Sequence, residues 1–564
     1  MKKRLAAAIL SFSMMLMLFP ITAFAVENYD LYLYLGNESV GTRVTSENAS
    51  DVLGDGTVSY DPDTCTLTLN NAKLAGIYTY GMDSKVLTIK VIGECIIDSP
   101  KFNAINLYAT TSAGPDYDQD SLVITGDGTL KINALAGNNV GIATYNDVTI
   151  KDTNVEINSA NYIAIALQTL NDPDLDDIDL NIINSTVTAT TNGASTNAIW
   201  VEDGAIKTDN STVTVKAEST TYPVLWAATA IEITNKSNVT ATGFESNTFY
   251  SDGDIVINDS VVKATDTSEY ALPAIYAYGD ITVENNSTVT AESRGMRGIY
   301  TGGNMTIDGS TVTASGTTNE GMVVVGTLNV NNAKLTASGS PDDIYIPAIV
   351  AEGLHITASD VTAKGGIQLF NYSSGLDDNI SFSITPGAGK TAEFKVDKNN
   401  WDGSAAAHFN EGTESPYDAA VNFDATEMNQ LSSYRYVHIG EHIHAGGTAT
   451  CTSKAVCSDC GREYGTALGH NVITSGARAA TCTAEGYTGD KVCEICGDVF
   501  EKGKTIPMLA HNYKNGVCTV CGAPSDGNAP QTGERSDMVL WVLALTLSGC
   551  ALAGAFVYAK RKKC

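Results

Sequence analysis

The chain has 564 residues, of which 43% are hydrophobic and 17% charged, and its formal net charge is −30. Nucleic acids and anionic lipid surfaces are themselves negative, so such an acidic chain is a poor partner for either. We therefore expect no nucleic-acid partner and a surface that leaves room for divalent cations.

The first 25 residues have the three parts of a secretory signal peptide. A basic start (Lys2, Lys3 and Arg4) is followed by an apolar stretch at residues 5–19 and by the small-x-small sequence AFA, which ends at Ala25. We predict cleavage after Ala25 and export of the chain.

A six-residue phrase recurs in the middle of the chain as NSTVTA, NSTVTV, KSNVTA, NSTVTA and GSTVTA, starting at residues 184, 210, 236, 286 and 309. A fixed period of this kind is typical of repeat architectures. After one longer step of 32 residues, the central apolar residues follow each other at steps of 23 to 27: Val155, Val187, Val213, Val239, Val262, Val289, Val312, Leu335 and Val361.

Each period contains three short pieces in which apolar and polar residues alternate, with Asn, Asp and Gly between them. Three strands per period predict one coil of a parallel β-helix, whose stacked coils bury a column of Val that no single coil could bury. We expect an all-β protein with a solenoid of roughly 11–12 coils. It would occupy residues 26–365, with an N-terminal cap near residues 30–54 and a C-terminal β cap at residues 366–440.

The residue before each recurring Ser is Asn at 184, 210 and 286, and Asp at 259. Asn332 occupies the same position in a later coil. Such residues suit tight turns, and like side chains stacked about 4.8 Å apart can form hydrogen-bond ladders. We expect a ladder along this corner of the solenoid.

Cys65 and Cys95 lie 30 residues apart, about one coil. If both point inward on neighbouring coils, they form either a disulfide or two buried thiols.

Two acidic insertions separate coils. Asp116, Asp118 and Asp120 alternate as in the first half of an EF-hand loop, and the segment DPDLDD with Asp179 forms a second acidic loop. Both are candidate calcium sites, although solvated acidic loops account for the same pattern.

An apolar residue is followed by an aromatic one in five successive coils. If the first residue of each pair is buried, alternation places the ring outside, in a column roughly 20 Å long. Ala143 and Ala166 precede the column and Val324 and Val350 follow it; its rings are Trp200, Trp226, Tyr250, Tyr276 and Tyr300.

Exposed aromatic strips often mark binding sites, and flat rings suit the C–H faces of sugars. We therefore predict carbohydrate binding through the column, with mutual stacking of the rings as the alternative interpretation. A passive surface spacer or a protein-binding adhesin is the rival functional class.

Parallel β-helices also include polysaccharide lyases and hydrolases. The predicted solenoid at residues 26–365 contains three arginines (Arg43, Arg294 and Arg297) and one histidine, His355. The clustered Asp, Gly-His-Gly and Arg-x-Lys elements of polygalacturonases are missing, so we expect no enzyme activity.

Eight of the twelve cysteines lie at residues 451–521, in units that look like zinc-ribbon knuckles. Three Cys and one His make a tetrahedral zinc set, whereas three Cys per unit leave one unpaired in disulfides. Disulfides remain the alternative in an exported segment, and His442 or His444 could complete a set. Read in chain order, the units are Cys451, Cys457, Cys460 and His470, then Cys482, Cys493, Cys496 and His511, then Cys518 and Cys521.

The last 40 residues contain PQTG, an apolar stretch at residues 538–559 and the basic tail KRKK. This arrangement resembles an LPxTG-type sortase sorting signal, with Ala529 in place of the usual Leu, and it is formed by Pro530, Gln531, Thr532 and Gly533. The resemblance implies a membrane span before sorting, cleavage after Thr532, and attachment to peptidoglycan of a Gram-positive wall. Both cleavages together would remove eight of the 34 Lys and Arg and two of the 64 Asp and Glu, which takes the net charge from −30 to −36.

Signal peptide, β-helix, Cys/His repeats and sorting signal together resemble clostridial cell-surface proteins with a right-handed parallel β-helix. The phrases GTVSYDPDTCTLTLNNAKL (residues 56–74) and LVITGDGTLKI (residues 122–132) look like the opening coils of that group. The resemblance implies an adhesive or carbohydrate-binding protein on the cell wall.

Overall fold

The computed structural model describes residues 28–525, except 38–39, 81, 83–84, 109–119, 136, 170–177, 194–195, 218–221, 271, 344, 371–379, 389, 409–430 and 459–460. The chain forms two compact units, Met1–His444, here called the solenoid unit, and Ala445–Cys564, here called the Cys/His unit. The signal peptide with Ala25, the sorting signal Pro530, Gln531, Thr532 and Gly533, and the apolar stretch after it lie outside the described residues. Within the described part, no helix is both long and apolar enough to cross a membrane.

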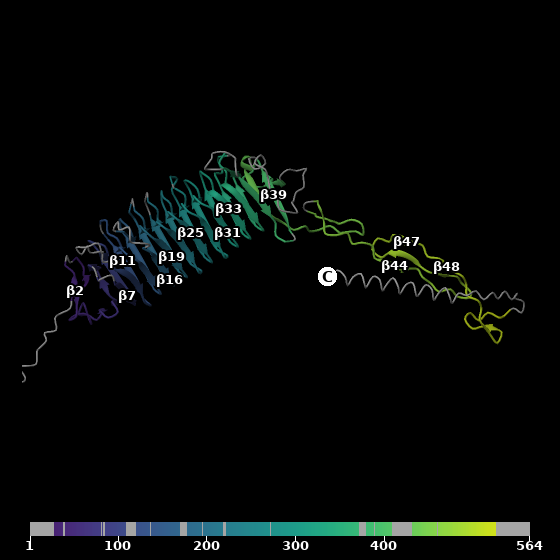
Figure 1. The fold of residues 1–564 in the computed structure, drawn as a ribbon, viewed down its shortest axis with the longest axis horizontal. Coiled ribbons are helices and arrows are strands. Elements are labelled where there is room, and N and C mark those ends of the chain that lie inside the picture. Colours follow the sequence, from purple (N-terminus) through teal and green to yellow (C-terminus); the bar gives the residue numbers. More distant parts are fainter. Residues whose placement is uncertain are drawn as a thin grey trace, which may run out of the picture. The chain divides into compact units, whose positions relative to one another are not determined.

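The solenoid unit is a parallel β-solenoid of about 11 turns, which confirms the predicted fold (Figure 1). Each coil contributes one strand to each of three walls. Within a wall, each strand pairs in parallel with the equivalent strand of the next coil. The first wall consists of β6 (Gly76–Tyr80), β9 (Ile105–Tyr108), β12 (Ile142–Thr144), β15 (Ile165–Leu167), β18 (Ile199–Val201), β21 (Leu225–Ala227), β24 (Phe249–Ser251), β27 (Ile275–Ala277), β30 (Ile299–Thr301), the starts of β33 (Met322–Asn331) and β35 (Ile349–Thr357), and β37 (Ile367–Leu369).

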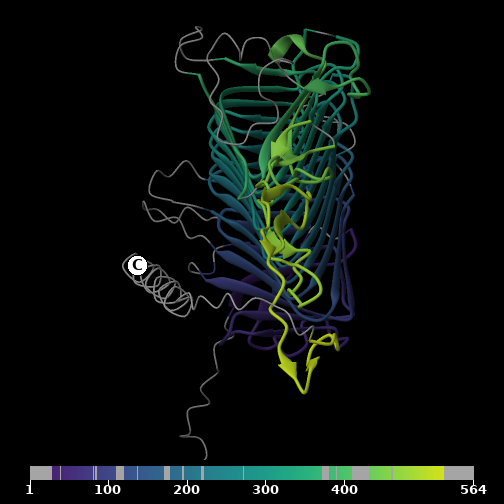
Figure 2. The ribbon, with the colours of Figure 1, turned by 90° about the vertical axis from the view of Figure 1, so that its right-hand side faces the viewer.

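The second and third walls follow in each coil, and the turned view shows the coils stacked in chain order from purple to green (Figure 2). The second wall contains β4 (Thr66–Asn70), β7 (Val86–Ile92), β10 (Ser121–Thr125), β13 (Val148–Lys151), β16 (Leu180–Ile183), β19 (Ala205–Asp209), β22 (Ala230–Thr234), β25 (Asp254–Asn258), β28 (Ile281–Glu284), β31 (Met305–Asp308), the ends of β33 and β35, and β38 (Ser381–Thr385). The third contains β5 (Lys73–Leu74), β8 (Glu94–Ser99), β11 (Thr129–Ala134), β14 (Asn154–Ser159), β17 (Thr186–Thr191), β20 (Thr212–Ala217), β23 (Asn238–Gly243), β26 (Val261–Asp266), β29 (Thr288–Ser293), β32 (Thr311–Gly316), β34 (Lys334–Ser338) and β36 (Asp360–Lys364).

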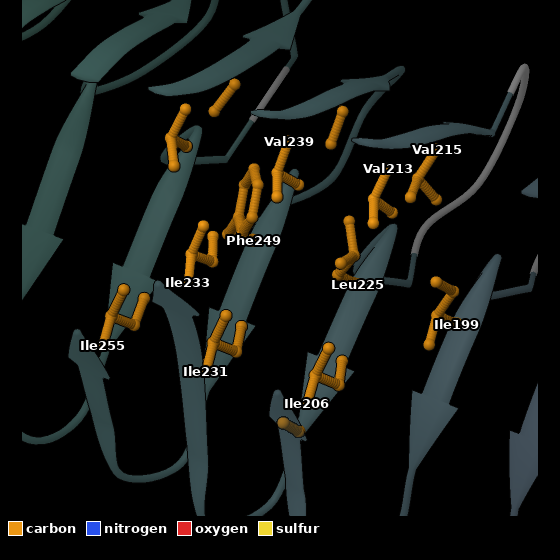
Figure 3. Close-up of a cluster of buried hydrophobic side chains, with 14 of the residues drawn as sticks. Ile199, Ile206, Val213, Val215, Leu225, Ile231, Ile233, Val239, Phe249 and Ile255 are labelled. Carbon is orange, nitrogen blue, oxygen red and sulfur yellow. The ribbon is translucent and has the colours of Figure 1, made fainter. Parts of the chain in front are cut away.

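The core runs along the interior between the three walls. The nine periodic apolar residues from Val155 to Val361 pair coil to coil in one register, and each is at most 1% exposed. Figure 3 shows Ile199, Ile206 and Val213 from one coil, together with their equivalents in the next coils, directed toward a common interior. Burial of this shared column provides the main driving force for folding, because no coil can shield it alone.

The turn between the second and third walls uses a left-handed residue in each coil. In five coils this residue is Asn or Asp with a φ between 44° and 54°: Asp152, Asn184, Asn210, Asp259 and Asn332. Asn and Asp tolerate this conformation better than other non-glycine residues. Part of the predicted side-chain ladder is present, from Asp152 through Asn184 to Asn210, with N···O distances of 3.1 and 2.9 Å. Among the described residues it does not continue to Asp259, Asn286 and Asn332.

The serine that follows this turn forms a second, buried ladder. The backbone N–H of each Ser donates to the Oγ of the Ser in the next coil at 2.9–3.2 Å. These bonds satisfy amide groups that the bend removes from regular strand pairing. In the recurring Asn-Ser pair, Asn thus adopts the φ that the bend requires and Ser accepts a backbone hydrogen bond. The ladder runs through Ser185, Ser211, Ser237, Ser260, Ser287 and Ser310.

The substitution Asn210→Val should lower the free energy of unfolding by about 2 kcal/mol. A β-branched residue is strained at positive φ, and the side-chain hydrogen bond to Asn184 is lost. Asn210→Gly is the matched control, since glycine adopts this φ freely. Denaturant unfolding should place the glycine variant within about 1 kcal/mol of the wild type. Equal losses for both variants would contradict a role for the backbone conformation.

Antiparallel strands close both ends of the solenoid. At the N-terminal end, β1 (Asn28–Tyr34) pairs with β2 (Thr42–Thr45) and with β6, and β3 (Val58–Asp61) forms a hairpin with β4. At the C-terminal end, β41 (Tyr436–His442) lies antiparallel between β36 and β39 (Thr391–Asp397), with β40 (Ala407–His408) and the short helix η1 (Leu431–Ser433) nearby in the chain. Such strands cover edges that would otherwise pair with other chains.

Cys65 and Cys95 are both free thiols. Cys95 lies in the core on β8, whereas Cys65 is only partly buried, at the turn between β3 and β4, with φ of 50°. The prediction of two inward-pointing residues on stacked positions is therefore wrong for Cys65, because its position belongs to the hairpin of the cap rather than to a regular coil.

The Cys/His unit consists of short antiparallel strands. They are β42 (Ala455–Val456), β43 (Glu463–Tyr464), β44 (Val472–Ser475), β45 (Gly486–Tyr487), β46 (Asp490–Cys493), β47 (Val499–Glu501), β48 (Thr505–Ile506), β49 (Tyr513–Lys514) and β50 (Val517–Cys518). Within its described residues, the buried hydrophobic side chains are all cysteines: Cys451, Cys457, Cys482, Cys493 and Cys518. This unit therefore has no apolar core of the usual kind.

Candidate functional site

The five predicted rings occupy one register on the outside of the first wall. Trp200 on β18 pairs with Trp226 on β21, and the register continues through Tyr250, Tyr276 and Tyr300 on β24, β27 and β30. The residue before each ring is at most 2% exposed, whereas each ring is partly exposed. Alternation along each strand explains this, because neighbouring residues point to opposite faces.

The rings stack in two groups, Trp200 with Trp226, and Tyr276 with both Tyr250 and Tyr300. Trp200 and Trp226 have ring centroids 5.7 Å apart and an interplanar angle of 12°. Tyr276 stacks on Tyr250 at 5.0 Å and on Tyr300 at 4.8 Å, with angles of 7° and 13°. Stacking covers the faces that the rings turn toward each other, so their edges are what the column presents outward.

Tyr278 and Asp252 lie beside the column and add polar groups to it. Tyr278 is 55% exposed and meets Tyr276 edge to face at 5.1 Å. Asp252 accepts a hydrogen bond from the indole Nε1 of Trp226 at 3.1 Å. Burial first, and the Asp252 carboxylate second, raise the pKa of Tyr250, so its phenol remains a hydrogen-bond donor at neutral pH.

A pocket of about 240 Å³ lies at the N-terminal end of the column. Trp200 and Trp226 form one part of its lining, and Tyr162 and Tyr222 form another, with polar groups from Thr196 and Asn197. The repeating pair of residues does not reveal Tyr162 and Tyr222, because they lie in the turns ahead of the strands. Their aromatic character at the same corner of two coils, with one coil between them, is the signal that could have revealed them.

Trp200 also packs against a small apolar cluster outside the main core, formed by Val140, Ala143, Ile163 and Ala166. The alanines occupy the register of the column in the two coils before it. The indole nitrogen of Trp200 is buried and has no hydrogen-bond partner among the described residues.

The far end of the column differs from expectation by one residue. Tyr300 pairs with Val323 rather than with Val324, and both valines are 0% exposed. The run MVVV has no alternation, so the sequence could not reveal which valine continues the outer register.

The cysteines and histidines of the second unit gather in two clusters that differ from the order predicted along the chain. In each cluster a Cys-x-x-Cys pair from one repeat meets a Cys and a His from the repeat before it. All ligand atoms of a cluster lie within 4.8 Å of one another. The first cluster is Cys451, His470, Cys493 and Cys496, and the second is Cys482, His511, Cys518 and Cys521.

Cluster distances fit a metal ion and not a disulfide. Sγ atoms are 3.5 Å apart for Cys451 and Cys493, and 3.7 Å apart for Cys482 and Cys518. A tetrahedral zinc ion with bonds of about 2.3 Å to sulfur requires S···S separations of about 3.8 Å, whereas a disulfide requires about 2.05 Å. None of the nine cysteines that the structure describes forms a disulfide.

In each Cys-x-x-Cys pair, the backbone amide of the second cysteine stabilises the thiolate form of the first. The amide of Cys496 lowers the pKa of Cys493 to about 6, and that of Cys521 lowers the pKa of Cys518 to about 5. The thiolate is the form of cysteine that binds metal. The first cysteine of each Cys-x-x-Cys turn is therefore prepared for a cation by the backbone of that turn.

The remaining candidate ligands are less complete. Cys457 is buried, and its predicted partner Cys460 lies outside the described residues. His442 and His444 meet edge to face within the solenoid unit, with centroids 4.9 Å apart.

Of the calcium candidates, Asp116 and Asp118 lie outside the described residues, as do the acidic residues of the second insertion before Asp179. Asp120 is 3% exposed and accepts hydrogen bonds from the backbone amides of Met82 and Lys85. Asp179 pairs with Lys207. Both carboxylates therefore have structural contacts of their own.

The structure defines the chain as a parallel β-solenoid followed by a unit with two Cys/His clusters that could each hold a metal ion. Comparisons of the chain with protein-family models, with curated proteins and with solved structures found no match.

Proposed function

We propose that the chain is a non-catalytic, carbohydrate-binding protein of a cell surface, and that the aromatic column is its binding site. One observation carries the proposal: five large rings lie in one outer register on consecutive coils, beside a pocket lined by four aromatic side chains. Aromatic edges next to hydrogen-bonding groups match the mixed apolar and hydroxyl surface of a sugar.

Polar groups at the column support the same ligand class. Asp252 offers carboxylate oxygens beside Trp226, and the protonated phenols of Tyr250 and Tyr276 can donate to hydroxyl oxygens. The unpartnered Nε1 of Trp200 is a further donor that a rearranged, ligand-bound pocket would satisfy.

The rival function is a passive spacer or protein-binding adhesin, in which the rings only stabilise the wall by stacking. The pocket favours a ligand over stacking alone, because rings that served only each other would not need the additional lining from Tyr162 and Tyr222. Lyase or hydrolase activity is the least favoured reading: His355 hydrogen-bonds Ser383 at 2.7 Å and Ser381 at 3.2 Å on the second wall, away from the ring column.

In this proposal the ends of the chain and the Cys/His unit serve presentation. The signal peptide directs export, the sorting signal at residues 530–533 attaches the chain to a Gram-positive wall, and zinc stabilises the Cys/His unit as a stalk. Three sulfurs and one nitrogen suit zinc and leave no open coordination position, so the role of the metal is structural.

The double substitution Trp200→Ala and Trp226→Ala tests the column. Each ring contact with a sugar contributes on the order of 1 kcal/mol, so affinity should fall about tenfold or more. Binding is measured on a glycan array and then by titration with the best-bound glycan. Because the rings are only partly buried, stability should fall by less than the ~3–5 kcal/mol that a single fully buried aromatic costs.

Two controls separate the outcomes. Tyr345→Ala removes a ring that is 85% exposed and lies away from the column, and it should leave affinity unchanged. A double variant that folds and keeps full affinity would place the site elsewhere, and a wild-type chain that binds no glycan would favour the spacer.

A further inference from the structure

Aromatic side chains continue along the first wall beyond the column, toward the N-terminal end. Tyr78 on β6 occupies the register of Trp200, through Asn106, Ala143 and Ala166. It is buried beneath Tyr34 and Phe102, with ring centroids 4.7 and 6.5 Å from its own. The exposed rings of this end therefore lie one step to the side.

Two residues further along each strand, a second row faces the same way. Tyr80 pairs with Tyr108 on β9, and Tyr145 occupies the equivalent place after β12, since Ile105 pairs with Ile142. Tyr80 and Tyr108 are 42% and 39% exposed and stack at 5.3 Å with an angle of 8°. We call Tyr80, Tyr108 and Tyr145 the N-terminal rings.

The N-terminal rings and the column form one track. The coil between them has Ala166 on β15 and no ring on its strand, but Tyr162 precedes that strand and lines the pocket with Trp200. From Tyr80 to Tyr300 the track crosses nine consecutive coils. At about 4.8 Å for each of eight steps, it is roughly 38 Å long.

The charge beside the track identifies the class of ligand. Glu202 and Asp252 follow Trp200 and Tyr250 by two residues, and so place carboxylates in the same row as Tyr278. The Arg297 guanidinium lies 5.9 Å from the centroid of Tyr300, but Glu320 pairs with it at 2.9 Å. A chain of uronic acids or sulfated sugars would meet repulsion along this track, whereas an uncharged chain would not.

We propose that the ligand is a long, uncharged polysaccharide that lies along the solenoid axis and contacts the N-terminal rings as well as the column. This inference rests on the proposed carbohydrate-binding function and adds the length, direction and charge of the ligand. Separate contacts along one chain add to the affinity, so a longer chain gains contacts that a short oligosaccharide cannot make.

The test uses the full-length chain and an array of neutral glucans, mannans, xylans and galactans with the anionic chains polygalacturonate and carboxymethyl cellulose. The best-bound polysaccharide is then cut into oligosaccharides from the disaccharide upward. Affinity should rise with length until the track is filled. The double variant Tyr80→Ala and Tyr108→Ala should bind the longest chains with about tenfold lower affinity. Its affinity for the shortest chains should change little.

Tyr345→Ala is again the control, because that ring is 85% exposed in the turn before β35, two coils beyond Tyr300. Thermal unfolding of each variant verifies that the fold is kept. Affinity that is independent of length, an equal loss for short and long chains, or preferred binding of the anionic chains would overturn this inference while leaving glycan binding in place. A wild-type chain that binds no member of the array would overturn the proposed function and this inference together.

Discussion

Removing metal from the Cys/His unit should unfold it while the solenoid unit keeps its structure. The buried hydrophobic side chains in the described part of the Cys/His unit are all cysteines, so a bound ion would take the place of an apolar core. Structural zinc contributes on the order of 10 kcal/mol to folding in small domains, far more than these short strands supply. After chelation, a protease should therefore cleave the chain beyond residue 444 and leave the solenoid unit intact. Mass spectrometry of the fragments locates the cleavage sites.

The two clusters make a sharper test with paired substitutions. Cys451→Ser with Cys496→Ser removes two ligands of one cluster, so the chain should lose one metal ion. Cys451→Ser with Cys482→Ser removes one ligand from each cluster and should lose two. Metal analysis after dialysis measures both. If ligands were instead grouped in chain order, the first pair would also lose two ions, and disulfides would show no metal and no free thiols under denaturant.

The neighbouring residues Phe249 and Tyr250 should respond very differently to truncation. Phe249 is 1% exposed and fills the solenoid interior, so Phe249→Ala should lower the free energy of unfolding by about 3–5 kcal/mol. Tyr250 lies on the outer face, and Tyr250→Ala should cost less than about 2 kcal/mol, mainly through lost stacking on Tyr276.

Denaturant unfolding followed by far-UV circular dichroism compares the two variants directly. Glycan affinity should show the reverse order, with Tyr250→Ala weakened and folded Phe249→Ala close to the wild type. Greater destabilisation by Tyr250→Ala than by Phe249→Ala would mean that the outer and inner faces of β24 are exchanged.

The regular coils were predictable because three features of the sequence indicate the same period. The central Val of each repeat, the polar residues beside it and the Asn-Ser turn all indicate one period, and the structure stacks them in that period. The serine ladder was not predicted, because it depends on the distance between coils and not on any pattern within one. Val324 was misplaced because an apolar run removes the alternation on which register depends.

The candidate sites were only partly predictable, for two reasons. Spacing within one repeat cannot reveal that ligands from consecutive repeats share a cluster, as Cys451 and Cys493 do. A repeated dipeptide reveals the rings of the column, but Tyr162 and Tyr222 enter the pocket from turns of variable length. The N-terminal rings escaped notice because their strands place aromatics two residues later than the column does.

The crossed clusters also determine how the Cys/His unit would respond to a pulling force. The first cluster, with a metal bound, would close a loop from Cys451 to Cys496, and the second a loop from Cys482 to Cys521, so the two loops share the segment between Cys482 and Cys496. Tension applied at both ends of the unit has to pass through both metal clusters in turn. Stretched chains with metal bound should therefore lengthen in abrupt steps as individual metal–thiolate bonds rupture. If the chain is attached to a wall as proposed, this unit would absorb shear before the attachment fails.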